Sequence, residues 1–315
     1  MSKENTAVTK KKIKRCKEDV VFDAACFIIL TLVLFVVAYP LYWVIISSIS
    51  APSAVSSGKV LLHPIGFTLK GYAEVFKNDQ VMRGFLNSLI ITFCGVMVNL
   101  IVTLPTSYAL SRSNFSGKKP ITIFYLITMF FGGGLIPTYL VIQRLQMLNT
   151  IWALILPGCL SVYNMIVART FFKSNISEEL YEAAEIDGCT QARFFFQIAL
   201  PLSKAIIAIL VLYYGVGHWN SYFSALVYIS DKAKYPLQLV LRNILITNQT
   251  ALSQTATTAA ARAALQEKQQ LIDVMKYSLI IISSIPVLVM YPLVQKHFVK
   301  GVMIGSSMIL RLLQN

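Results

Sequence analysis

Acidic side chains gather in one short segment of an otherwise apolar chain. The segment, 177–188, reads SEELYEAAEIDG, and its acids are Glu178, Glu179, Glu182, Glu185 and Asp187. In a helix, Glu178, Glu182 and Glu185 would share one face because they lie four and three residues apart. Such carboxylates can exchange protons with a substrate or dock onto a partner. General acid–base catalysis is the interpretation that we favour least.

Other residue types that do chemistry are scattered. The 5 cysteines show no paired spacing and the 3 histidines no metal-ligand spacing. The phosphate-binding pattern G-x-x-x-x-G-K-[ST] is absent from the sequence. Gly132, Gly133 and Gly134 lack the lysine and precede Pro137, so they predict a kink or a close helix contact. We therefore predict that the chain is not an enzyme and holds no metal or cofactor.

The elements that position these residues are long and apolar. The chain has 315 residues, 56% hydrophobic and 13% charged, with a mean hydropathy of +0.64, whereas soluble domains are about a quarter charged. A bilayer core takes about 20 apolar residues per helix, so we predict an all-α membrane protein. Its six transmembrane helices are predicted at 22–49, 84–110, 121–141, 151–167, 205–227 and 277–294.

Positive charge predicts the orientation and the domains. Most of the 28 lysines and arginines fall in segments that share one side, which predicts that both termini are cytoplasmic. The predicted parts are a basic tail (1–19), a six-helix transmembrane domain (20–298) and a C-terminal cytoplasmic tail (299–315). The domain includes a long inner loop (168–204) and a long outer loop (228–276). Anionic lipid accounts for the net charge of +14, so nucleic acid is not a predicted partner.

The inner loop carries local signals for a short surface helix. Ser177 can cap a helix that begins with Glu178 and Glu179, where negative charge is favourable. Leu180, Ala183 and Ala184 form a side that can pack closely. Gly188 predicts a left-handed turn, Phe194, Phe195 and Phe196 an aromatic anchor, and Pro201 a bend into the next span. The helix either docks onto a soluble partner or lies at the membrane interface without one.

The order of residues in this loop resembles a known motif. Glu182-Ala183-Ala184, Gly188, Ile198 and Leu200-Pro201 resemble the EAA motif of binding-protein-dependent ABC importer permeases. Other stretches resemble the maltose-type carbohydrate permeases, especially the branch that imports complex oligosaccharides: 131–139, 148–157, 169–172, 216–220 and 295–305. Ser177, Cys189 and the segment after Gly305 depart from that pattern.

The resemblance implies a type I ABC importer permease fold with a cytoplasmic coupling helix, in a bacterial cell membrane. It implies a second homologous permease, two ATPase subunits that bind ATP and Mg, an extracellular solute-binding protein and a carbohydrate substrate, an oligosaccharide. On that analogy the residues that couple the chain to an ATPase are Glu182, Ala183, Ala184, Asp187 and Gly188.

Polar and aromatic residues inside two predicted spans can line a sugar path. They are His218, Trp219, Asn220 and Tyr222 in the fifth span, and Asn87, Ser88 and Asn99 in the second. The alternative is that they bond neighbouring helices, a common use of such groups in membranes.

Three other functions remain open on the sequence. The chain can be a permease for another solute, an ion-driven transporter or channel, or a membrane enzyme that uses the carboxylates of 178–187. Few ionisable residues lie inside the predicted spans, which disfavours an ion-driven mechanism. Dependence on a separate ATPase distinguishes the importer permease from the others.

Overall fold

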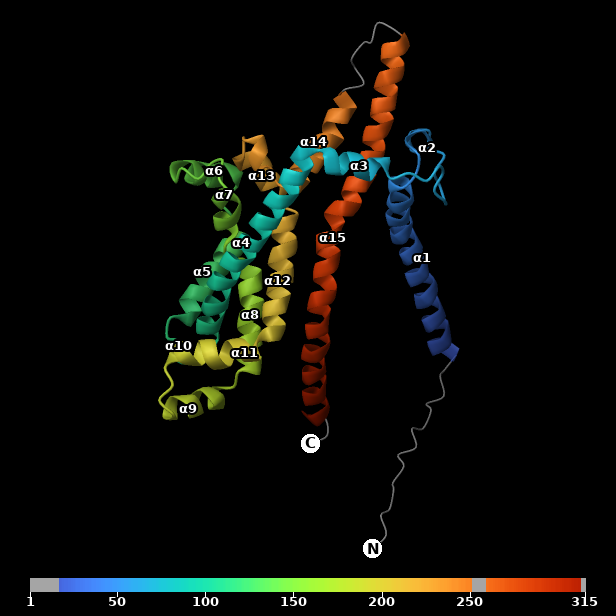
Figure 1. The fold of residues 1–315 in the computed structure, drawn as a ribbon. Helices are drawn as coiled ribbons and strands as arrows, with labels where there is room; N and C mark the ends of the chain where they lie inside the picture. Colours follow the sequence, from blue (N-terminus) through green and yellow to red (C-terminus); the bar gives the residue numbers. More distant parts are fainter. Residues whose placement is uncertain (1–16, 251–258, 313–315) are drawn as a thin grey trace.

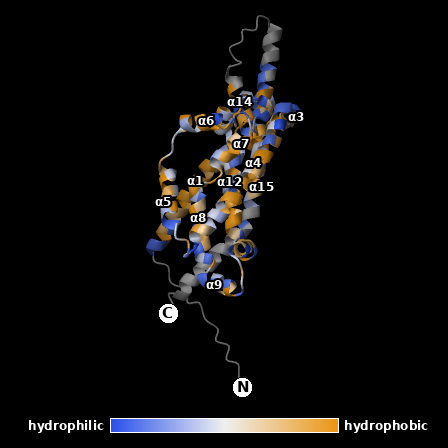
Figure 2. Ribbon diagram, turned by 90° about the vertical axis from the view of Figure 1, so that its left-hand side faces the viewer, coloured by the Kyte–Doolittle hydropathy of each residue, from blue (hydrophilic) through white to orange (hydrophobic). Residues whose placement is uncertain are grey.

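The computed structural model describes residues 17–250 and 259–312 as a set of helices joined by short turns (Figure 1). Within these ranges no β-strand occurs, as expected of an all-α protein. Hydrophobic residues run along the middle of the helices and hydrophilic residues gather toward their ends (Figure 2). This distribution suits helices that cross a bilayer.

Among the described residues, three helices are long and apolar enough to cross a membrane unaided. They are α1 (Lys17–Ser48), α4 (Asp79–Ser111) and the Gln269–Pro292 part of α15 (Ala259–Leu312). Three bent pairs of helices pass the same test together, which gives up to six spans if each pair is one span.

The third predicted span is not one continuous helix. α5 (Lys118–Phe130) and α6 (Leu135–Arg144) enclose an angle of 112° across the glycine cluster. Gly134 has a φ of +88°, a backbone conformation that glycine adopts without the steric cost of a side chain. Of the two predictions for the glycine cluster, the kink is confirmed, and the predicted span over 121–141 is divided between two helices.

The fourth and fifth predicted spans are broken as well. α7 (Trp152–Ile155) and the 3₁₀ turn η1 (Leu156–Gly158) meet α8 (Val162–Asn175) at 52°. α12 (Lys204–Trp219) ends before α13 (Tyr222–Tyr228), so a single helix over 205–227 is wrong. Hydropathy located the apolar segments, but it does not report where the backbone turns within them.

The predicted outer loop 228–276 is largely helical. It contains η3 (Lys232–Lys234), α14 (Leu237–Thr250) and the first part of α15. Residues 251–258 of that loop and 1–16 of the predicted basic tail lie outside the described residues. The predicted C-terminal tail is described from 299 to 312, where it continues α15.

α4 is the central helix, and it packs against α8, α12 and α14. At its C-terminal end an aromatic core surrounds Tyr108 and Phe172, and nearer its N-terminal end a second core contains Ile91 and Leu239. α2 (Pro52–Ser56) and α3 (Lys70–Lys77) both pack on α15. α1 contacts α15 through its C-terminal end, while its most apolar stretch is unburied.

Candidate functional site: the coupling helix and a polar groove

The short surface helix predicted in the inner loop is present as α9 (Glu178–Ile186). The Ser177 hydroxyl accepts a hydrogen bond from the Leu180 backbone N–H at 3.3 Å, so the predicted N-cap is confirmed. Gly188 follows the helix with a φ of +75°, which confirms the left-handed turn. Figure 1 shows α9 at one end of the helical assembly, beyond the ends of α4 and α12.

One face of α9 packs inward and the rest is exposed. Tyr181 is buried and Ala184 is half-buried against the aromatic core around Tyr108 and Phe172. Of the residues predicted to pack closely, Leu180 and Ala183 are instead exposed. Tyr181 and Ala184 are three residues apart and so share a face of α9. This face packs against the end of α4 and the segment that follows α9.

The predicted coupling residues form an exposed set at the end of the molecule. Glu182, Ala183, Asp187 and Gly188 are exposed and Ala184 is half-buried. The structure brings them together within one short helix and its turn. Ile186 lies beside them and is 87% exposed.

The segment after α9 anchors it to the membrane helices. α10 (Gln191–Phe194), the π-helical turn η2 (Phe195–Ala199) and α11 (Leu200–Leu202) meet α12 at 80°, which confirms the predicted bend beside Pro201. Phe194 and Phe195 are buried, whereas Phe196 is 65% exposed. The predicted aromatic anchor therefore consists of two of the three phenylalanines.

Aromatic rings join this anchor to α4 and α9. The Tyr108 ring centroid lies 5.0 Å from that of Phe195, and 5.7 Å from that of Phe172. Tyr181 on α9 meets Phe194 edge to face at 5.3 Å. Aromatic pairs of this geometry each contribute about 0.5–1.5 kcal/mol beyond their buried area.

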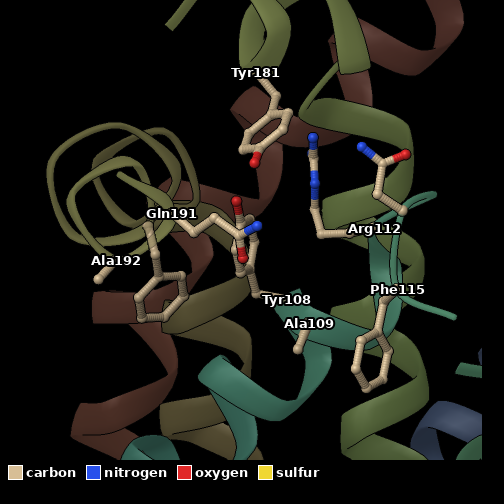
Figure 3. Close-up of a pocket in the computed structure, with 9 residues that line it drawn as sticks. Tyr108, Ala109, Arg112, Phe115, Tyr181, Gln191 and Ala192 are labelled. Carbon is tan, nitrogen blue, oxygen red and sulfur yellow. The ribbon is translucent and has the colours of Figure 1, made fainter. Parts of the chain in front are cut away.

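A cavity of about 290 Å³ opens at this junction (Figure 3). Its lining comes from the C-terminal end of α4, the following turn, α9, α10 and the start of η2. The residues are Tyr108, Ala109, Arg112, Asn114, Phe115, Tyr181, Gln191, Ala192 and Phe195. Arg112 forms an ion pair with Glu178 at the first position of α9. The sequence analysis did not single out Arg112, because its partner lies far along the chain.

Two of the residues predicted for a sugar path lie together in the middle of the helices. His218 Nε2 on α12 lies 2.7 Å from Asn99 Oδ1 on α4, and the Asn99 amide donates to the Gly158 carbonyl at 2.7 Å. A Cβ at Gly95 would come 2.5 Å from His218 Nε2. The absence of a side chain at Gly95 therefore admits the imidazole next to α4.

The other predicted path residues bond nearby backbone or are exposed. Trp219 is buried and its indole N–H donates to the Ser283 carbonyl at 2.9 Å. Asn87 donates to the carbonyls of Ala233 and Tyr235, and the Ser88 hydroxyl accepts from the Leu237 N–H at 2.8 Å. Asn220 donates to its own helix, and Tyr222 is 44% exposed. These bonds match the helix-bonding alternative for Asn87, Ser88 and Trp219.

A groove that the sequence did not reveal runs beside His218. One cavity of about 570 Å³ lies between α8, α12 and α15, and its lining is Tyr163, Asn164, Leu212, Tyr213, Val216, Val287 and Tyr291. A neighbouring cavity of about 300 Å³ shares Asn164 and Tyr213 and adds His218. Exposed tyrosines inside otherwise apolar spans were the available signal, but only the packing shows that they converge.

The groove combines flat rings with hydrogen-bonding groups. Tyr163, Tyr213 and Tyr291 are each between 43% and 59% exposed, so their ring faces are accessible. Asn164 and His218 add an amide and an imidazole to the same lining. Apolar faces with a few placed polar groups are typical of small-molecule sites.

Comparison with known proteins identifies the family. The chain is 38% identical over 286 residues to the protein LplC of Bacillus subtilis (strain 168), covering 91% of this chain and 94% of LplC. It is 35% identical over 285 residues to the polygalacturonan/rhamnogalacturonan transport system permease protein YtcP of the same organism, covering 90% and 97%. No protein-family model matches the chain.

A solved structure has the same fold. It is the crystal structure of a bacterial ABC transporter involved in the import of the acidic polysaccharide alginate, with a TM-score of 0.81 and 27% identity over 91% of this chain and 99% of that chain. The chain belongs to the permease family of carbohydrate ABC importers and is an integral membrane protein. The family inferred from the EAA motif is confirmed.

Proposed function

We propose that this chain is the permease subunit through which an ATP-driven importer moves an oligosaccharide into the cell. The observation that carries the proposal is the E-A-A segment of α9, with Glu182 and Ala183 exposed, held at one end of the helical assembly away from the polar groove. A helix placed in this way can receive force from a soluble motor while the groove receives substrate. The chain itself acts as a conduit and not as an enzyme.

The proposed orientation has six spans and both termini in the cytoplasm. Each bent pair then counts as one span, and α9 lies inside. The cationic residues near α9 support this orientation, since short cytoplasmic segments are rich in lysine and arginine. They are Arg112, Lys118, Lys119, Arg169, Lys173 and Arg193.

The proposed complex contains a second homologous permease, two ATPase subunits and an extracellular binding protein. The ATPase subunits would bind ATP and Mg. α9 would fit a groove on one ATPase, with Glu182 and Asp187 as polar contacts and Ala183 and Ala184 allowing close approach. Gly188 would supply the turn that returns the chain to the membrane. YtcP and GanQ, two of the relatives, are described as transport system permease proteins, which supports a multi-protein complex.

The proposed substrate path is the groove of Tyr163, Asn164, Tyr213, His218 and Tyr291. Its lining contains no lysine or arginine, so its contacts to a sugar would be ring faces and neutral hydrogen bonds. Relatives are described as permeases for polygalacturonan or rhamnogalacturonan and for galactooligosaccharides. These descriptions support an oligosaccharide as the substrate class.

The test begins with assembly of the whole transporter. The tagged permease is expressed with the neighbouring genes of its operon, purified in nanodiscs and assayed for ATP hydrolysis with and without the binding protein and a sugar. The neutral sugar galactotriose and the acidic sugar trigalacturonate are tested in parallel. We expect the wild type to retain the ATPase subunits and to be stimulated. The double variant Glu182→Ala with Gly188→Pro should lose stimulation.

A matched control is Glu179→Ala, which removes an exposed carboxylate from the same helix outside the motif. It should behave as the wild type does. Sugar-stimulated hydrolysis that is unchanged in the double variant would refute docking through α9. Uptake of sugar into liposomes by the permease alone would instead favour an independent channel or ion-driven transporter.

A further inference from the structure

We propose that Arg112 is a positioning residue for energy coupling: it fastens α9 to the inner end of α4, so that α4 carries the displacement of α9 to the groove. The inference rests on the proposed docking role of α9. It assigns a function to a residue that lies outside the EAA motif, at the C-terminal cap of α4.

Arg112 holds α9 at two points. Its guanidinium forms an ion pair with Glu178, and its central carbon lies 4.3 Å from the ring centroid of Tyr181. Glu178 and Tyr181 are three residues apart and therefore share a face of α9. A planar guanidinium can pair with a carboxylate and lie over an aromatic ring at the same time, which a lysine ammonium does less well.

The burial of Arg112 distinguishes this contact from an ordinary surface ion pair. Exposed pairs contribute about 0–1 kcal/mol because water screens them. The Arg112 side chain is only 13% exposed, whereas that of Glu178 is 39% exposed. The rings of Tyr108 and Phe194 also lie within 6 Å of the guanidinium carbon, at 5.7 and 5.9 Å. Arg112 is thus enclosed by rings from α4, α9 and α10, and Figure 3 shows two of them, those of Tyr108 and Tyr181.

The turn that presents Arg112 is itself fixed. The Ser113 backbone N–H donates to Glu178 Oε1 at 2.9 Å, and its hydroxyl donates to the same oxygen. Lys118 Nζ donates to the carbonyls of Arg112 and Ser113 at 3.3 and 3.0 Å. The two Ser113 bonds and the Arg112 ion pair would have to break or move if α9 shifted without α4, while the Lys118 bonds hold the turn itself.

The charge state of Glu178 supports a bond that exists at neutral pH. Burial raises the pKa of the Glu178 carboxyl. Hydrogen bonds from Ser113 and the charges of Arg112 and Lys118 lower this pKa, and together they outweigh the effect of burial. The net pKa lies below its ordinary value. The carboxylate is therefore ionised in the cytoplasmic pH range.

α4 reaches the groove from this point through a series of bonds. Ser107 donates to the Met165 carbonyl on α8 at 3.0 Å, and Thr103 bonds to the Tyr214 hydroxyl on α12 at 2.7 Å. Asn99 then bonds to His218, and both Tyr214 and His218 line the groove. A shift of α4 along its axis or about it would move these groove residues with it.

The experiment uses the complete transporter in nanodiscs, and its probe is whichever of galactotriose and trigalacturonate stimulates the wild type more. Arg112→Gln keeps a polar side chain but removes the charge, Arg112→Lys restores the charge, and Lys173→Gln removes an exposed charge from the end of nearby α8. For each variant, retention of the ATPase subunits, basal hydrolysis and stimulated hydrolysis are measured on the same preparation.

We expect Arg112→Gln to retain the ATPase subunits and to lose about fivefold or more of the stimulation by binding protein and sugar, a coupling loss within the ordinary allosteric range. Arg112→Lys should recover part of that loss, and Lys173→Gln should match the wild type. If Arg112 were needed only for folding, Arg112→Gln would lower retention of the ATPase subunits and basal hydrolysis together, and Arg112→Lys would not recover stimulation.

Failure of the inference differs from failure of the proposed function. If the wild type is stimulated and Arg112→Gln is stimulated equally, α9 docks but Arg112 does not position it. If the wild type retains no ATPase, the docking role of α9 is wrong and the inference falls with it. Glu178→Gln provides a second test should Arg112→Gln fail to fold, since Glu178 is more exposed and should show the same loss.

Discussion

The imidazole Nε2 of His218 lies 2.7 Å from the amide oxygen of Asn99, and this bond joins α12 to α4 where the polar groove opens. Because an amide oxygen only accepts, Nε2 is the donor. The Asn99 amide in turn donates to the Gly158 carbonyl. Asn99 thus ties the end of η1 and the C-terminal end of α12 to one point on the central helix.

Replacing Asn99 by alanine should lower the stability of the permease. The change leaves the His218 N–H and the Gly158 carbonyl without their partners, which costs about 1–3 kcal/mol. Thermal unfolding in detergent measures the loss. Asn220→Ala is the control, because Asn220 is exposed and bonds only to its own helix; an equal loss in both variants would contradict a special role for Asn99.

Removing a ring from the groove should reduce sugar uptake without reducing stability. Tyr291→Ala takes away an exposed ring and should lower uptake by about two- to tenfold if the ring contributes a stacking energy typical of aromatic contacts. Tyr291→Phe keeps the face and should retain most of the uptake. Uptake into proteoliposomes that contain the whole transporter is the measurement.

Phe93→Ala serves as the control for that experiment. Phe93 is 70% exposed on α4 but is absent from the lining of the groove. If Phe93→Ala and Tyr291→Ala reduce uptake alike, loss of apolar surface and not the groove explains the effect.

Two glycines with nearly the same backbone geometry separate strain from function. Gly188 has a φ of +75° and Gly58 a φ of +68°, and a Cβ at either would meet nothing within 4 Å. Alanine at either position costs about 1–2 kcal/mol for the left-handed conformation. Only Gly188→Ala should reduce sugar-stimulated ATP hydrolysis; a comparable reduction in Gly58→Ala would show that the loss reflects general destabilisation.

The ion pair of Glu178 should disappear in acid. The pKa of Glu178 is lowered in the folded protein from its ordinary value of 4.5, so its contribution to stability is complete above that value and is lost as the pH falls through the lowered pKa. The difference in unfolding temperature between wild type and Glu178→Gln should be constant from about pH 7 to pH 5 and shrink below that. A difference that grows in acid would contradict the sign.

Local signals let the sequence predict the backbone course of segment 177–201. Ser177, Gly188 and Pro201 act on the backbone next to them, so the cap, the turn and the bend follow without knowledge of the fold. The broken spans carry a local signal at two places, the glycine cluster that ends at Gly134 and the Pro157-Gly158 dipeptide. Nothing as local marks the end of α12 at Trp219.

Contacts between distant segments could not be predicted from the sequence. Ser113 and Glu178 are 65 residues apart in sequence, and no residue type at either position specifies the other. The same holds for Tyr163, Tyr213 and Tyr291, which converge only because α8, α12 and α15 pack together. The first part of α15 is too polar for a hydropathy pattern to mark as a helix. The sequence therefore left open whether this part of 228–276 is flexible or a helix that orders only in the complex.

Ile186 gives the isolated subunit a defect that assembly would repair. This side chain is 87% exposed beside Glu182 and Ala183. Its helix lies beyond the ends of α4 and α12 (Figure 1). Burying an isoleucine fully is worth about 1.5–3 kcal/mol, so a partner that covers α9 gains that free energy from a single residue. In a permease without partners, this apolar side chain would stay exposed to chaperones and proteases. The lifetime of the subunit in the cell would then depend on how soon a partner covers α9.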